Sequence, residues 1–485
     1  MSTTDTPVAT PTQRELLVDP TSGNKPKTVV RLRDWEYMER ALQRLIAGWG
    51  RYFSEWEDKV AIHRQIWEQA ECVRRLRDRL AQFPGSVHNL DQPVSQKLEA
   101  LANTVLLAPT HQDAVDGIYQ VLNGALTTAY LQYAEHAHPV HDAPTVAALH
   151  EIIGVKEQQR LWLREYRRRY PHKIDADYRA AIERELAACG GLLQALPVEG
   201  RPAAPAGVNT DFRLPARPAY PADSRSKYQI MPCIDADFTH SVETRRLFWC
   251  YGYLREMNLA MDQLCWIYDS PDMPWAFHQD ISRHLWDESR HGDSGHSRLL
   301  DFGITLRDIG FQPYDDSLVD APGMPPAAPQ FATADAIPAM GRLDPLTPQQ
   351  LYDAVFTTGM VAETGHFAVK REGYVDFQAG GDLESAEMMI FDIIDESAHV
   401  QYAHQWLSAL AERAGVDNSN YRERGAQERQ RRQEAHLHHI EAVTQQPRGP
   451  NDPAYIFYQQ LLAIMRAQHP LANAATCPPR SPKPM

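Results

Sequence analysis

Two short segments of the chain repeat one run of acidic and histidine residues. Residues 287–291 read Asp-Glu-Ser-Arg-His, and residues 395–399 read Asp-Glu-Ser-Ala-His. A glutamate and a histidine three positions apart lie on the same face of a helix, from which a carboxylate and an imidazole can reach one metal ion. A single Glu-x-x-His arises often by chance, so the prediction of a metal site depends on the repeat and on what surrounds it.

Each motif also follows a glutamate at nearly the same distance. Glu256 precedes Glu288 by 288 − 256 = 32 residues, and Glu363 precedes Glu396 by 396 − 363 = 33 residues. A helix rises about 1.5 Å per residue, so two antiparallel helices of about 27 residues place such residues at one level. Two such hairpins packed face to face would bring together four carboxylates and two histidines. The predicted metal ligands are Glu256, Glu288, His291, Glu363, Glu396 and His399.

The surroundings of these residues favour a buried site. Met257 and Met261 lie near the first glutamate, Val361 and Phe367 near the third, and Ile393 precedes the last. Burying four carboxylates without cations would be very costly, whereas oxygen and imidazole donors suit iron or manganese. The alternative is a solvated helix face for each glutamate and an ordinary core histidine.

This ligand pattern resembles that of the ferritin-like dimetal-carboxylate proteins, in which two helices give one glutamate each and two give Glu-x-x-His. Residues 287–291 further resemble the Asp-Glu-x-Arg-His motif of bacterial dimetal monooxygenases, but the second copy has Ala398 in place of the arginine. The resemblance covers residues 240–415. It implies a four-helix bundle with one long crossover, two iron ions (or manganese, or one of each) and O2 as co-substrate.

The function that the resemblance implies is a non-haem diiron oxidase or monooxygenase. Such an enzyme would hydroxylate, N-oxygenate, desaturate or cleave a small organic substrate. No flavin or nicotinamide fingerprint is present, so we expect an external electron donor or a small reductant. A ferroxidase or other iron-handling protein is the alternative function, and a metal-free helical protein is the third.

Several further residues are candidates for the same site. His366 forms another Glu-x-x-His with the glutamate at 363 and could be a seventh ligand or an ordinary histidine between helices. Tyr253 and Tyr402 each lie one turn from a predicted ligand, as catalytic or hydrogen-bonding groups or as core aromatics. Asp287 and Asp395 could accept hydrogen bonds from the ligating histidines, which usually give their second N–H to a carboxylate.

Long amphipathic patterns predict an all-α protein. In the second half, helices are expected at about 242–268, 274–300, 348–374 and 383–414. Thr347, Pro348 and Gln350 form a start signal, and Gly415 a stop signal. In the first half, helices are expected at about 33–53, 60–83, 112–138, 145–169 and 175–195. The predicted domains are a disordered 1–28, a helical bundle at 29–195, a Pro-rich linker at 196–238, the dimetal bundle at 239–420, and a helical extension with a Pro-rich tail at 421–485.

The first half repeats this plan without its histidines. Glu71 follows Glu39 by 71 − 39 = 32 residues, and Glu71 and Glu157 are each followed three positions later by arginine. Arginine cannot bind a metal ion but can replace one by a salt bridge. The first bundle is therefore predicted to be degenerate and metal-free, with two unrelated bundles as the alternative. The two arginines are Arg74 and Arg160.

The charge and composition of the chain limit the classes of partner that it is expected to bind. The net charge of −14 argues against binding nucleic acid or anionic membranes. Residues 1–14 show no secretory signal, and no segment approaches the roughly 20 apolar residues of a membrane helix. The six cysteines include no Cys-x-x-Cys pair, which argues against a zinc ribbon or an iron–sulfur cluster and fits a cytoplasmic location. The expected partners are a small substrate and a reductant, and a homodimer is compatible with these features.

Overall fold

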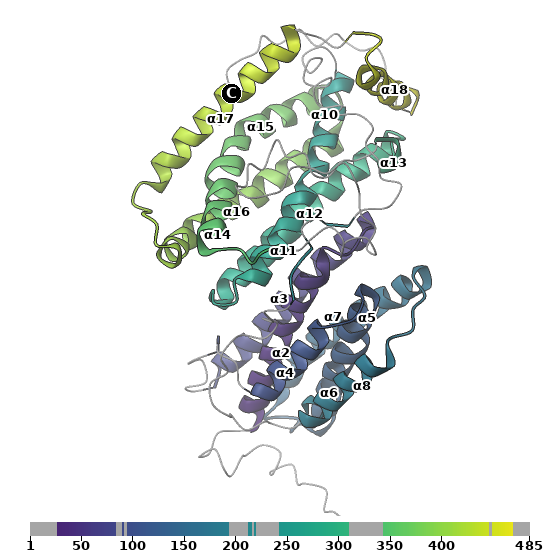
Figure 1. Ribbon diagram of the computed structural model, residues 1–485, viewed down its shortest axis with the longest axis vertical. Coiled ribbons are helices and arrows are strands. Elements are labelled where there is room, and N and C mark those ends of the chain that lie inside the picture. The colour runs from purple at the N-terminus through teal and green to yellow at the C-terminus, as the bar shows by residue number, and fades with distance from the viewer. Residues whose placement is uncertain are drawn as a thin grey trace, which may run out of the picture. The chain divides into compact units, whose positions relative to one another are not determined.

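The computed structural model describes residues 27–83, 90–91, 95–193, 212–215, 218–219, 242–309, 343–445 and 449–468. Within these ranges the regular secondary structure is helical, and no strand occurs (Figure 1). The all-α prediction is confirmed. The expected N-terminal disorder, most of the Pro-rich linker, and much of the crossover and tail lie outside the described residues. No described helix is long and apolar enough to cross a bilayer.

The chain divides into two compact units, neither of which is one continuous stretch. The first comprises residues 1–50, 65–214 and 267–279, and the second comprises 51–64, 215–266 and 280–485. The helices that the first unit contributes are α2 (Lys27–Gly50), most of α3 (Trp56–Ala81), α4 (Gln96–Leu106), α5 (His111–Val115), the π-helix η1 (Asp116–Leu122), α6 (Asn123–His136), α7 (Ala143–Arg169), α8 (Ala176–Ala188) and the short 3-10 turn η2 (Gly190–Leu192).

Helix α4 of the first unit was not among the predicted helices. Its buried residues, Leu98, Leu101, Ala102, Val105 and Leu106, recur at the three- and four-residue spacing of one helix face. The Ser95 side chain accepts a hydrogen bond from the backbone amide of Lys97 and so caps the first turn. The sequence therefore contained the signal for this helix.

The helices of the second unit position the candidate site. They are α10 (Val242–Leu254), most of α11 (Glu256–Asp269) and of α12 (Trp275–Asp301), α13 (Leu306–Ile309), α14 (Pro348–Val355), the π-helix η4 (Phe356–Glu363), α15 (Thr364–Ala379), α16 (Leu383–Ala414), α17 (Tyr421–Gln445) and α18 (Pro453–Gln468). Both predicted helix-end signals are confirmed. Thr347 and Gln350 form a capping box at α14, and Gly415 ends α16 with φ 68°.

Two of the helices predicted for the second unit are not regular. The helix expected at 242–268 is broken at Arg255, and the helix expected at 348–374 contains the π segment η4. Glu256 is therefore the first residue of α11 and Glu363 is the last residue of η4, whereas Glu288 and Glu396 lie in the middle of long helices. A π segment shifts the side chains that follow it and is frequent at functional sites.

Small residues let these helices approach closely. A Cβ on Gly295 of α12 would lie 2.6 Å from the Cys250 carbonyl oxygen and from the Tyr253 Cβ, and a Cβ on Gly359 of η4 would overlap Ala403 of α16. Helix α17 packs against η4, where Arg429 donates a hydrogen bond to the Met360 carbonyl. Close packing on both sides holds the site residues in a fixed register.

Candidate metal centre

Side chains from α11, α12, η4 and α16 converge in the second unit. They form three overlapping groups whose ligand atoms lie within 4.8 Å of one another. All six predicted ligands belong to at least one group, and every member is buried except the half-buried Glu256. The groups are His284, Glu288, Glu363 and His399; Glu256, Glu288 and His291; and Glu256, Asp392 and Glu396.

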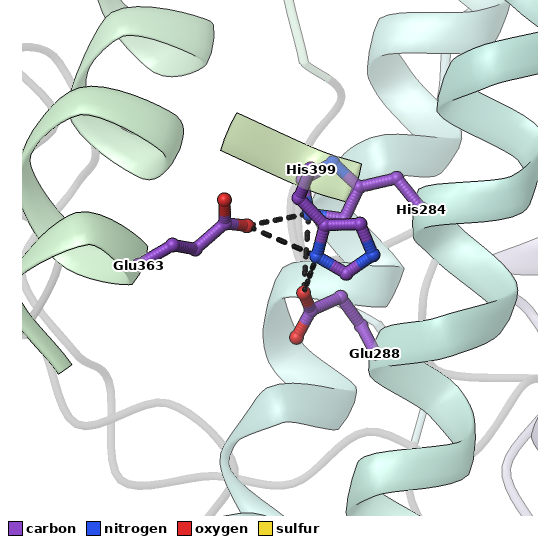
Figure 2. A group of neighbouring side chains, drawn as sticks. All are labelled: His284, Glu288, Glu363 and His399. Atoms are coloured by element: carbon purple, nitrogen blue, oxygen red, sulfur yellow. Dashed lines mark hydrogen bonds and ion pairs between the residues drawn. The ribbon is translucent and has the colours of Figure 1, made fainter. Parts of the chain in front are cut away.

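The first group contains two imidazoles and two carboxylates (Figure 2). His284 Nε2 lies 2.8 Å from Glu363 Oε1 and 3.1 Å from Glu288 Oε1. His399 Nδ1 lies 3.3 Å from each of the same two oxygens. The two imidazole rings stack with their centroids 3.7 Å apart. Four donor atoms from three helical segments therefore face a common point.

The second group shares Glu288 with the first. Glu288 Oε1 faces His284 and His399, whereas its Oε2 lies 4.0 Å from His291 Nδ1. His291 Nδ1 lies 3.1 Å from Glu256 Oε2. The carboxylate of Glu288 thus points one oxygen toward each of the two groups that contain histidine.

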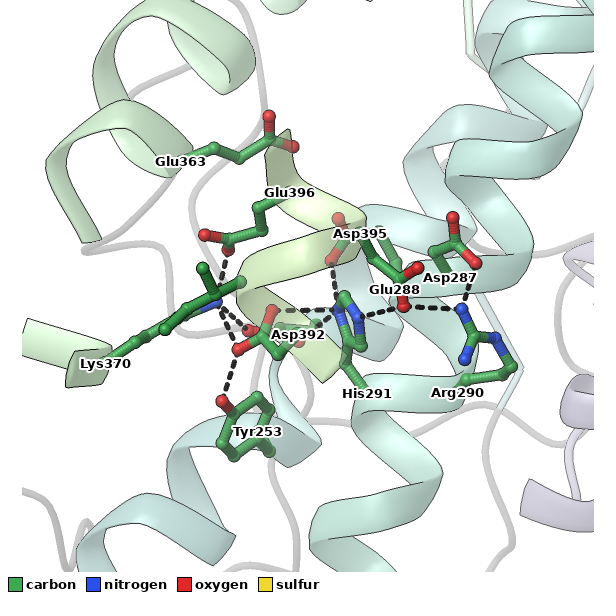
Figure 3. A network of polar contacts seen from close by, with 12 residues as sticks. Tyr253, Asp287, Glu288, Arg290, His291, Glu363, Lys370, Asp392, Asp395 and Glu396 are labelled. Carbon is green, nitrogen blue, oxygen red and sulfur yellow. Dashed lines mark hydrogen bonds and ion pairs between the residues drawn. The ribbon is translucent and has the colours of Figure 1, made fainter. Parts of the chain in front are cut away.

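The third group contains only carboxylates, and a lysine ammonium lies among them (Figure 3). Lys370 Nζ is 2.6 Å from Asp392 Oδ2, is paired with Glu396 Oε1, and is 3.6 Å from Glu256 Oε1. The hydroxyl of Tyr253 donates a hydrogen bond to Asp392 Oδ2. The side chain of Lys370 is 4% exposed, so its charge is held inside the protein.

The aspartate of each motif contacts the histidine of the other. His291 Nε2 lies 3.3 Å from Asp395 Oδ2, and His399 Nε2 lies 3.3 Å from Asp287 Oδ2. Arg290 contacts both aspartates, its Nη2 lying 2.6 Å from Asp395 Oδ2. A proton on each Nε2 donated to these carboxylates leaves Nδ1 with a lone pair directed into the site, which is the tautomer that binds a metal ion.

Several polar atoms of the site are buried without a hydrogen-bond partner in the described part of the chain. They include Glu363 Oε2 and Glu396 Oε2. Leaving such atoms unsatisfied costs free energy, and a cation coordinated by them would recover it. The donor set of buried carboxylates and imidazoles therefore fits divalent metal ions.

The carboxylates of the site differ in their acidity. Burial raises the pKa of Glu256 and Glu396, and attraction to Lys370 offsets only part of this effect because other carboxylates lie nearby. Burial also opposes ionisation of Glu363, but the two facing histidines outweigh it and hold its pKa at about 2. The carboxylates of the first group are therefore ionised, whereas burial and crowding in the third group oppose ionisation of Glu256 and Glu396.

The nearby carboxylates also change the pKa values of the histidines. Burial lowers the pKa of His291 and His399, but the facing carboxylates, above all Asp392 for His291 and Glu363 for His399, outweigh it. Both pKa values are raised well above the ordinary 6.5. Without bound metal, both imidazoles are charged at neutral pH.

The metal-free protein should therefore lose stability as the pH rises above 6.5, the ordinary pKa of histidine. In that window the unfolded chain has released the protons of His291 and His399, while the folded chain still holds them. Linkage then lowers the free energy of unfolding by up to about 1.4 kcal/mol per pH unit for each histidine. Urea unfolding of chelator-treated protein across this range measures the slope.

Metal-loaded protein provides the control, because an ion on Nδ1 replaces the proton. Its affinity for the ion should rise with pH over the same window, since fewer protons must be displaced. Metal-free protein whose stability increases with pH above the ordinary histidine range would contradict the assignment of charge at these two residues.

The remaining predicted residues are placed differently. Tyr253 is buried and contacts the site through Asp392. Tyr402 is half-buried on α16, with its ring centroid 6.2 Å from that of His399. His366 lies exposed on α15 and belongs to none of the three groups. The structure thus brings one of these three side chains into the polar network.

Three residues of the site escaped the sequence interpretation. His284 precedes Glu288 by four residues, and Asp392 precedes Glu396 by four residues. Residues four positions apart lie on one helix face. Both motifs therefore extend one turn toward the N-terminus, to His-x-x-x-Glu-x-x-His at 284–291 and Asp-x-x-x-Glu-x-x-His at 392–399. Lys370 gives no such signal, because a lysine on a helix is ordinarily a surface residue.

The first unit also contains a buried polar cluster, with a different cation from the predicted one. Lys156 Nζ lies 2.5 Å from Glu39 Oε2 and 2.9 Å from Gln69 Oε1, and Tyr130 donates to Glu39 Oε1 at 2.5 Å. Arg74 and Arg160 do pair with Glu71 and Glu157, three residues before them. Both pairs are at least partly exposed to solvent and lie outside the buried cluster. The cation that faces Glu39 is therefore a lysine.

Comparisons with protein-family models, with curated proteins and with solved structures found no match to this chain. The chemistry assigned to it consequently depends on its own residues and their geometry.

Proposed function

We propose that the second unit is a ferritin-like dimetal-carboxylate bundle and that the protein is an oxygen-activating oxidoreductase. The observation that supports this proposal most directly is the orientation of Glu288, which offers one carboxylate oxygen to each of two groups that contain histidine. Iron bound there would activate O2, with two electrons per turnover returned by an external donor or small reductant and the rest supplied by a small organic substrate as it is hydroxylated, N-oxygenated, desaturated or cleaved.

Different residues of the chain would hold the two metal positions and orient their ligands. His284, Glu363 and His399 face one position, and Glu256 and His291 face the other. Aspartates outside the centre accept the Nε2 protons and so fix the orientation of two of these imidazoles. Burial excludes water from the ligand atoms, which protects a reactive centre from side reactions.

A ferroxidase is the second candidate, because the same ligand types also serve iron oxidation. The two functions differ in what happens to iron. In an oxygenase the ions stay bound, whereas in a ferroxidase they are substrate and leave as ferric iron. The first unit and the C-terminal helices α17 and α18 are additional to a four-helix bundle and are not needed for iron storage, which favours the oxygenase.

Oxygen uptake with excess ferrous iron separates these functions without knowledge of the organic substrate. Anaerobic protein loaded with ferrous iron is mixed with O2 and further ferrous iron in an oxygen electrode. We expect uptake that matches the bound iron and then stops while free ferrous iron remains. Sustained uptake with accumulation of ferric iron supports the ferroxidase, and no uptake by a fully loaded protein overturns both.

Glu363→Gln is the matched variant for this experiment. It keeps the volume of a buried side chain but replaces an oxygen that faces both His284 and His399 with a weaker donor. The variant should bind less iron and lose the stoichiometric uptake. Glu165→Gln, which changes an exposed glutamate of α7, should leave both unchanged.

A further inference from the structure

The carboxylate group of the site already holds a cation that belongs to the chain. Lys370 reaches from α15 to Asp392 and Glu396 of α16, and its Nζ lies 3.6 Å from Glu256 Oε1. The ammonium also lies 5.6 Å from the centroid of the Tyr253 ring. An ammonium enclosed by three carboxylates occupies a group of hard oxygen donors that would otherwise suit a divalent ion.

The charges of the site balance only when this lysine is counted. When bound ions hold all five carboxylates of the three groups ionised, the charges of these carboxylates and of Lys370 sum to −5 + 1 = −4. Two divalent ions bring that sum to zero. The lysine therefore supplies the positive charge that two divalent ions leave lacking. A third divalent ion would give the buried site a net positive charge that no carboxylate of the three groups balances.

The position of the lysine is not symmetric with respect to the two histidine groups. Its partner Glu256 is a member of the second group, and its partner Asp392 lies 3.5 Å from His291 Nδ1 of that group. The contacts of Lys370 with carboxylates are to Glu256, Asp392 and Glu396, none of which belongs to the first group. An ion in the second group thus lies beside a fixed positive charge.

We propose that Lys370 makes the two metal positions unequal. Its ammonium competes for the carboxylates of the second group and repels an ion there, so that the position of His284, Glu363 and His399 binds metal tightly and the position of Glu256 and His291 binds it weakly. This inference rests on the proposed dimetal site and adds that the second ion is bound reversibly under the control of a lysine.

A simple structural salt bridge would have a different consequence. If Lys370 only neutralised Asp392, its removal would destabilise the fold but would not change the two metal affinities selectively. The measurement that distinguishes them is the separate affinity of each position rather than the stability or the activity of the protein.

Anaerobic titration of the metal-free full chain with Co²⁺ provides that measurement, by calorimetry and by the visible absorption of bound cobalt. Wild-type protein should bind two ions in two resolved phases. Lys370→Met should strengthen the weaker phase by about tenfold or more, because it removes a charge next to the ligands, and should leave the stronger phase within about twofold. Lys370→Arg retains the charge and should keep the weaker phase weak.

A second variant guards against loss of folding. Lys370→Met leaves Asp392 without its cation, which could destabilise the fold. The double variant Lys370→Met/Asp392→Asn keeps the net charge of the metal-free core unchanged. In the double variant the weaker phase should be stronger than in Asp392→Asn alone. Equal affinities in the wild type, or variants in which the weaker phase does not strengthen, overturn the inference. A wild-type protein that binds no cobalt overturns the proposed function instead.

Discussion

Replacing Glu288 with glutamine should remove most of the metal from both positions. Glu288 belongs to both groups that contain histidine, with one oxygen directed at each. Glutamine keeps the volume but has one acceptor and an NH₂ group that repels a cation, so it cannot bridge two ions. Metal content measured by elemental analysis should fall from about two ions per chain to well below one.

Two matched variants separate this result from a general loss of structure. His284→Ala changes a ligand of the first group only and should cost about one ion per chain. Glu157→Gln changes a half-buried glutamate of the first half, at the place that corresponds to Glu396, and should leave metal content unchanged. Glu288→Gln protein that retains both ions would show that this carboxylate does not bridge.

Much of the second unit could be predicted because its residues follow simple helical periodicity. The bounds of α16 agree with the expected 383–414, and its cap at Gly415 follows from the freedom of glycine to adopt a positive φ. The repeated Glu-x-x-His brought six side chains to one place because spacing within a helix fixes which face each residue occupies. These are local properties, and local properties can be read from sequence.

The irregular segments could not be predicted in the same way. The break at Arg255 and the π-helix η4 each displace a predicted ligand, Glu256 and Glu363 respectively, from the middle of a regular helix to an element boundary. A π-helix has no distinctive residue signature and depends on packing against neighbours, here Ala403 of α16 and Arg429 of α17. The role of Lys370 likewise depends on which helix faces which.

The two halves share more than the spacing of their glutamates. In each, a threonine caps a short helix that runs into a π segment and then into a longer helix: Thr110 before α5, η1 and α6, and Thr347 before α14, η4 and α15. This shared irregularity supports the prediction that the first half repeats the plan of the second. The two buried clusters nevertheless differ, because the lysine comes from the fourth long helix, α7, in one and from the third, α15, in the other.

The second large effect is expected in that first cluster. Lys156→Met should destabilise the first unit by about 3–5 kcal/mol, because it leaves the carboxylate of Glu39 buried without its cation. Hydrogen exchange of peptides from α2 and α7 resolves this unit from the rest of the chain, and their protection should fall accordingly. Metal content should not change, since all three groups within ligand distance lie in the other unit.

Adding Glu39→Gln to Lys156→Met tests whether the lysine acts by its charge. Glutamine is neutral and can still accept from Tyr130, so no charge remains buried, and the double variant should recover most of the lost protection. Arg160→Gln, which breaks only an exposed pair with Glu157, should leave α7 protected as in the wild type. If Lys156→Met were as stable as wild type, or if it lost metal, Lys156 would not be the cation that takes the place of ions in the first unit.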